Sequence, residues 1–158
     1  NREISKNKGA RGPRKSIVAR MTTTLNTTFL PFVDSEESLT FYRDVLGFEL
    51  RMDVGKGNMR WLTLGLPGQD DVSLVLEPPA LDQGLSDAER EAIKSMMDKG
   101  SYARIILATD DLQGIFEKAV AAGAPVEQEP TTQPYGVRDA ALRDPAGNLV
   151  RISEKGSR

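Results

Sequence analysis

Apolar residues recur at helical spacing in two similar stretches of the chain. Each stretch begins at an aspartate, Asp34 or Asp110, and ends thirteen positions later at a glycine, Gly47 or Gly123. Aspartate is favoured at the start of a helix, and glycine is favoured just past its end. The pattern therefore predicts one amphipathic helix in each stretch.

Strand-like runs surround both predicted helices. The first helix follows "TTFLPFV" and precedes "ELRMDV", "MRWLTLGL" and "VSLVLE"; the second follows "YARIILAT" and precedes "PVEQE", "YGVRDAALR" and "NLVRIS". We therefore expect an α+β fold of two tandem βαβββ modules, at about residues 25–79 and 101–154. A third helix at about residues 86–99 should connect them, because Ser86 and Glu89 form a capping-box pattern. We expect the methionine-rich face of this connecting helix to pack on the core.

Charge divides the chain at Met21. Residues 1–20 hold seven Lys or Arg and one Glu, a net charge of +6, so the remaining residues carry −8. We interpret 1–20 as a basic leader, either a flexible arm or a remnant of expression, with a single domain at 21–154 and a tail at 155–158. A nucleic-acid-binding arm is the alternative, but the acidic domain shows no basic and aromatic interleaving, so no nucleic acid partner is expected.

Composition excludes several kinds of chemistry. The 158 residues include no histidine and no cysteine, which excludes imidazole bases, Ser-His triads, thiolate nucleophiles and disulfides. No apolar run is long enough for a membrane span, and no apolar signal segment is visible. We expect a soluble, cytoplasmic protein with no membrane partner.

Two motifs in this order resemble the vicinal oxygen chelate superfamily, which includes glyoxalase I, bleomycin-resistance proteins and extradiol dioxygenases. They are "FYRDVLGF" at residues 41–48 and "RDPAGNLVRI" at residues 143–152, one in each predicted module. The resemblance covers about residues 25–154. It implies paired modules whose curved sheets enclose a cavity, usually in a homodimer. Independently of the family, the proline and glycine of the "DPAGN" segment predict a turn. We interpret Asp144 as a carboxylate that stabilises this turn.

The resemblance also implies four metal-ligand positions, which fall at Thr27, Glu77, Arg104 and Arg151. Only Glu77 is a credible ligand. Two guanidinium groups in the first shell of a divalent ion would repel it. We therefore expect a site that has lost its metal, and no cofactor.

Strand alternation, combined with the family topology, directs Glu77, Arg104 and Arg151 toward one pocket. One interpretation is a Glu-Arg ion pair that fills the vacated metal position. The other is that two cations against one anion favour an anionic ligand, with Glu77 as the general base if there is turnover. Thr27, Phe29, Trp61 and Tyr135, the last on the penultimate predicted strand, are further candidates for the ligand-binding surface.

Three functions remain open at this stage. The first is a metal-free pocket that binds a small anionic or enolisable organic molecule. The second is a glyoxalase-like or dioxygenase-like enzyme, a lyase, isomerase or oxidoreductase. The third is a dimeric interaction module with no small-molecule function. Because fold does not fix function, the sequence orders these alternatives without deciding between them.

Overall fold

The two predicted modules are present in the computed structural model, which describes residues 22–157. The basic leader lies outside the described residues. The first module contains β1 (Thr27–Pro31), α1 (Ser35–Thr40), the π-helical turn η1 (Phe41–Val45), β2 (Glu49–Lys56), β3 (Met59–Gly65) and β4 (Ser73–Glu77). After the connecting helix α2 (Asp87–Asp98), the second module contains β5 (Arg104–Thr109), α3 (Leu112–Ala121), β6 (Val126–Thr132), β7 (Arg138–Arg143) and β8 (Leu149–Glu154). The α+β prediction of two βαβββ units is confirmed.

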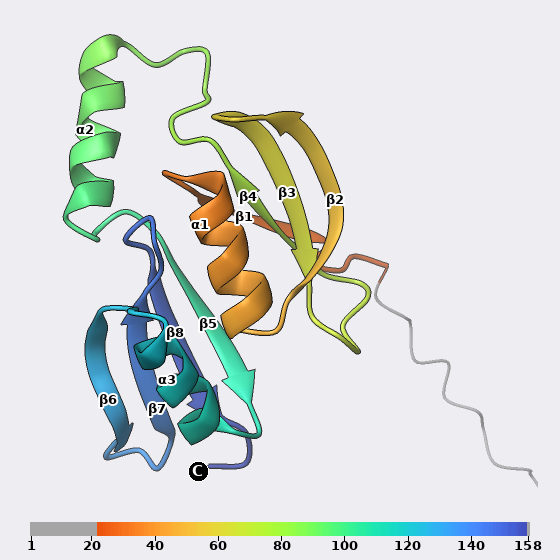
Figure 1. Ribbon diagram of the computed structural model, residues 1–158, viewed down its shortest axis with the longest axis vertical. Coiled ribbons are helices and arrows are strands. Elements are labelled where there is room, and N and C mark those ends of the chain that lie inside the picture. The colour runs from red at the N-terminus through yellow and green to blue at the C-terminus, as the bar shows by residue number, and fades with distance from the viewer. Residues whose placement is uncertain (1–21, 158) are drawn as a thin grey trace, which may run out of the picture.

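Each module forms its own four-stranded mixed sheet, and the two sheets have the same topology. The strand orders are β1-β4-β3-β2 and β5-β8-β7-β6. In each sheet the first and last strands of the module pair in parallel, and the other pairs are antiparallel. Figure 1 shows the sheets as separate layers that do not join into a closed barrel.

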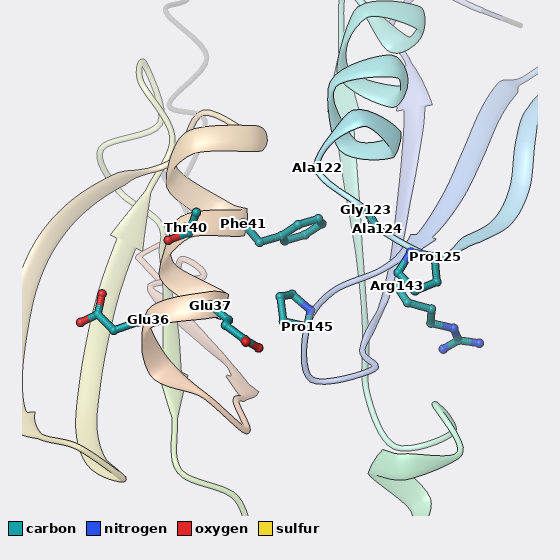
Figure 2. A pocket seen from close by; sticks show the side chains of 10 residues that line it. All are labelled: Glu36, Glu37, Thr40, Phe41, Ala122, Gly123, Ala124, Pro125, Arg143 and Pro145. Atoms are coloured by element: carbon teal, nitrogen blue, oxygen red, sulfur yellow. The ribbon is translucent and has the colours of Figure 1, made fainter.

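The core lies on the helix side of both sheets. In the first sheet, Leu62, Leu64, Leu74 and Leu76 are buried together with Tyr42 of η1. The second sheet contributes Ala140, Leu142, Val150 and Ile152 to the same apolar cluster, along with Phe116 of α3. In Figure 2, α1 lies between the first sheet and the second module. One continuous core therefore holds the two modules together.

The helix boundaries follow the predicted caps with one shift. Asp34 accepts a hydrogen bond from the backbone N–H of Glu37 at 2.9 Å, as the sequence predicts. In the second module the cap is Asp111, which accepts from Gly114, so that helix begins one residue later than the pattern from Asp110 suggests. The first helix continues as a π-helical turn, which the spacing of apolar residues did not reveal.

A buried polar network joins the two sequence motifs. The hydroxyl of Tyr42 donates to Asp144 Oδ2 at 2.7 Å, and the Asn148 side-chain amide donates to the same oxygen and to the carbonyl of Pro31, at 2.8 and 2.9 Å. The other oxygen of Asp144 accepts from the backbone N–H groups of Ala146 and Asn148. Asp144 is therefore the turn-stabilising carboxylate that the sequence indicated, and it also ties the second module to η1 of the first.

The connecting helix α2 has the predicted capping box between Ser86 and Glu89. Met97 is buried, whereas Met96 is well exposed, so the methionine-rich face packs only in part. The end of α2 approaches the second module closely: a Cβ added at Gly147 would lie 2.8 Å from the carbonyl oxygen of Met97, and Gly147 has a φ of +84°. Both facts require glycine at this turn. No helix within residues 22–157 has the length and apolar character needed to cross a membrane.

Candidate functional site

The face of each sheet opposite its buried core leucines or valines carries most of the predicted site residues; we call it the open face. In the first sheet, strand pairing places Thr27 beside Ser73, Phe29 beside Val75 and Pro31 beside Glu77. Trp61 alternates with the buried Leu62, which places it on the open face with Thr63, the partner of Val75. Thr27, Phe29, Trp61 and Glu77 therefore share one surface.

This open face is largely apolar and accessible. Met52 and Val54 of β2 pair with Thr63 and Trp61, so they belong to the same surface. Phe29, Met52 and Val54 are 53%, 59% and 52% exposed. Large apolar side chains gathered on one accessible surface are typical of binding sites.

Glu77 lies at the end of this apolar surface. Partial burial raises the pKa of its carboxyl above the ordinary value. Among residues 22–157 no ion pair reaches it. A half-buried carboxylate with a raised pKa can accept a proton from a ligand more readily than an ordinary glutamate does.

The open face of the second sheet contains both predicted arginines, together with the exposed Ile106. Ile106 pairs with Arg151 and Arg104 pairs with Leu149, so the two arginines lie on the same face of the parallel strands β5 and β8. Arg104 is exposed and forms no ion pair with another described residue. It borders a hollow of about 310 Å³ together with Tyr102 and Leu149.

Arg151 is held by a carboxylate that the sequence analysis did not single out. Its guanidinium contacts Asp139 Oδ2 at 3.2 Å, and Asp139 is only 2% exposed. The side-chain amides of Gln128 and Gln133 each donate to Asp139 Oδ1 at 2.8 Å. Burial acts to raise the pKa of Asp139, but the hydrogen bonds from Gln133, Gln128 and Arg151 outweigh it, and the pKa lies below its ordinary value. Asp139 is therefore a buried anion that neutralises Arg151.

The sequence pattern is sufficient to place Asp139 on the same face as Arg151. Asp139 alternates with Ala141 in "RDAALR", and Ala141 is the strand partner of Arg151. The sequence could not predict which face of the sheet carries Gln128, because the pairing of β6 with β7 shifts register on both sides of this residue. Sequence alternation alone cannot follow such a shift.

Within one chain, Glu77 and the two arginines belong to different sheets. No hydrogen bond or ion pair among the described residues joins Glu77 to Arg104 or Arg151. Tyr135 was expected on the penultimate strand, and that placement is wrong: it lies in the turn before β7 and is 70% exposed. The Pro134 to Gly136 segment forms this turn, which is the ordinary preference of proline and glycine.

The four positions implied as metal ligands do not fit a divalent ion. Thr27 and Glu77 offer one hydroxyl and one carboxylate, whereas Arg104 and Arg151 offer only cationic donors. Within the part of the chain that the structure describes, no three His, Cys, Asp or Glu side chains gather closely enough to hold a metal ion. The absence of a metal in the protein remains a prediction for elemental analysis.

Two cavities of about 500 Å³ or more lie away from the open faces. One, of about 500 Å³, separates α1 from the second module. Figure 2 shows Phe41 projecting from the first module into this crevice and Glu37 beside Pro145, while Arg143 points away from it. The other, of about 540 Å³, lies along α2. Neither is lined by a residue that the sequence analysis proposed for the site.

Residues 24–152 match the Glyoxalase/Bleomycin resistance protein/Dioxygenase superfamily, and the chain belongs to this family. The resemblance seen in the two motifs is thereby confirmed. Among individual relatives, the chain is 32% identical over 123 residues to the uncharacterized protein YurT of Bacillus subtilis (strain 168), covering 77% of this chain and 91% of YurT.

Solved structures agree with the family. The structure of UcmS2 superposes with a TM-score of 0.71 at 27% identity, covering 84% of this chain and 98% of UcmS2. The structure of TnmS3, an antibiotic binding protein from Streptomyces sp. CB03234, gives a TM-score of 0.63 at 27% identity, covering 85% of this chain and 98% of TnmS3.

Proposed function

We propose that the protein binds a small anionic or enolisable organic molecule on its open faces, without a metal ion. The observation that carries the proposal is the contrast between the two open faces. The first sheet offers exposed apolar side chains, Phe29, Met52 and Val54, and the second offers the cation Arg104, which has no ion-pair partner among the described residues. An apolar wall with a few polar anchors is the usual composition of a small-molecule site.

Arg104 is the cation that we assign to the ligand. Arg151 already forms an ion pair with Asp139, so its electrostatic attraction for an incoming anion is weaker. Arg104 lies on the neighbouring strand β5, on the same face of the sheet, and its guanidinium donors are available to a ligand. Charge-assisted hydrogen bonds from a guanidinium suit carboxylates, enolates and phenolates.

We propose further that a second copy of the chain completes the site. Exposed apolar side chains gathered on one face often mark an interaction surface, and oligomers most often form as twofold dimers. The apolar open face of one copy would then lie against the cationic open face of its mate, with the ligand between them. Light scattering that shows a monomer at micromolar concentration, with and without ligand, would count against this arrangement.

The similarity to an antibiotic binding protein supports small-molecule binding as the function. The experiment is a calorimetric screen of small carboxylates, phenols and 2-oxo acids, each paired with an uncharged analogue of the same size. We expect at least one anion to bind more tightly than its uncharged analogue, and Arg104→Met to remove that preference. If Arg104→Met binds the anion as tightly as the parent protein does, the assignment of Arg104 is wrong.

An enzyme with Glu77 as general base is the second candidate, because burial raises the pKa of this carboxyl and leaves it free to take a proton. Glu77→Gln separates the two functions. A binding protein keeps or improves its affinity for the anion when this negative charge is removed. An enzyme keeps the affinity and loses turnover. Turnover retained in Glu77→Gln would exclude Glu77 as the base.

A further inference from the structure

The cavity along α2 has the features of a small-molecule site that is separate from the open faces. It encloses about 540 Å³ between α2 and the first module. Val33 after β1 and Met59 at the start of β3 line one side, and Ile93 and Met97 of α2 line the other. Val33 and Met59 are both well exposed. The volume and the apolar lining fall in the range of sites for small organic ligands, roughly 300 to 1,000 Å³.

The segments on either side of α2 accept hydrogen bonds from two arginines. Figure 1 shows α2 standing apart from both sheets. Near its start, Arg90 donates to the carbonyl oxygens of Ala80 and Asp82. Past its end, Arg143 of the second module donates to the carbonyl oxygen of Gly100 at 2.6 Å. These bonds restrain the loop before α2 and the turn after it.

Arg90 is the chemical anchor of the cavity. Its guanidinium has five N–H donors, and two of its nitrogens donate to the carbonyls of Ala80 and Asp82. It is half-buried and forms no ion pair with a carboxylate within residues 22–157. A cation that is partly removed from water, with donors to spare, favours an anionic group.

The loop that faces Arg90 is also unusual. Ala80 has a φ of +55° and is the only non-glycine residue with positive φ in the described part of the chain. Such a conformation is costly for alanine, and residues held this way are concentrated at ligand and active sites. Here it occurs in the residue whose carbonyl binds the cavity's arginine.

The remaining charges at the cavity lie at its rim. Lys94, Glu91 and Asp98 all line it and are exposed to solvent. Water and salt screen these three groups more than they screen Arg90. We propose that the cavity along α2 is a second binding site, which takes an organic acid with an apolar body and places its acidic group against Arg90. This site does not depend on the function proposed for the open faces.

Two dyes test the proposal, because they share one ring system and differ in charge. They are 8-anilino-1-naphthalenesulfonate and the uncharged N-phenyl-1-naphthylamine, each titrated by its own fluorescence at about 0.15 M salt. In the parent protein we expect saturable binding of both, with the sulfonate tighter. Arg90→Met should weaken the sulfonate on the order of tenfold and the uncharged dye far less. Lys118→Met, which removes an exposed cation from α3, is the matched control and should change neither.

A second variant is needed because Arg90→Met also removes the hydrogen bonds to the loop carbonyls. Ile93→Trp keeps the arginine and fills the cavity, so it should weaken both dyes. Phe29→Asp, on the open face, should leave this binding component unchanged. If Ile93→Trp has no effect and Phe29→Asp abolishes dye binding, the dyes occupy the open face, and the α2 proposal fails while the proposed function stands. Absence of saturable binding of either dye also overturns the α2 proposal.

Discussion

Arg151 and Arg104 lie on the same open face, but we predict that they have different tasks, structural for Arg151 and ligand-directed for Arg104. Replacing Arg151 by methionine removes one of three donors to Asp139, which is 2% exposed. The loss of a hydrogen bond between charged groups costs roughly 1.5 to 3 kcal/mol. The Arg151 contact is 3.2 Å long and its side chain is 31% exposed, so solvent screening reduces this to about 1 to 2 kcal/mol.

Arg104→Met is the matched variant, because it removes the same charge from the neighbouring strand. Arg104 forms no ion pair with another described residue, so its loss should change the free energy of unfolding by less than about 0.5 kcal/mol. Its effect should appear in the affinity for an anionic ligand. Arg151→Met should show the opposite pattern, a loss of stability with a smaller loss of affinity.

Urea unfolding of the two variants and of Asp139→Asn measures these effects. A double-mutant cycle between Arg151 and Asp139 isolates their interaction from other consequences of each change. We expect a coupling free energy of about 1 kcal/mol and no coupling between Arg104 and Asp139. Equal destabilisation by the two arginine variants, or zero coupling in the Arg151 cycle, would refute the assignment of separate tasks.

Three further predictions follow from the buried groups and from the donor set. Tyr42→Phe removes the buried hydrogen bond to Asp144 and should lower the free energy of unfolding, measured by urea titration, by about 1 to 2 kcal/mol. The control is Tyr102→Phe, at a partly exposed ring, which should not change the free energy of unfolding measurably. The pKa of Asp139 is lowered in the folded state, so its contribution to stability is present above the unfolded value of about 4 and is lost as pH falls. The stability difference between parent and Asp139→Asn should therefore shrink on acidification below about pH 4, and a difference that grows there would contradict the cause given for the shift. Elemental analysis should find no stoichiometric zinc, iron, nickel or manganese; about one metal per chain that is lost in Glu77→Ala would overturn the metal-free site.

The architecture was predictable because the local signals agreed with one another. The caps at Asp34 and Ser86 are where the sequence placed them. Alternation in the strands was sufficient to assign Phe29, Glu77 and Arg151 to the faces opposite the core. Period and capping are properties of neighbouring residues, so they can be read from the chain.

The partners of the site residues were less predictable, because they depend on contacts between distant segments. Asp139 reaches Arg151 only after β7 pairs with β8, and Gln128 reaches Asp139 only through an irregular strand. The sequence interpretation counted two arginines against Glu77 and overlooked the nearer carboxylate. Tyr135 was placed at the entry to the penultimate strand, although "QPYG" is stronger turn chemistry.

The central claim, ligand binding on the open face of the first sheet, has an intrinsic reporter. Trp61 is the only tryptophan of the chain and lies on that face beside Val54. A titration of Trp61 emission with the anion selected by calorimetry should show a saturable change whose midpoint agrees with the calorimetric dissociation constant. Phe29→Asp should abolish that change. Binding that calorimetry detects in full while the emission of Trp61 stays constant would place the ligand elsewhere and contradict the account.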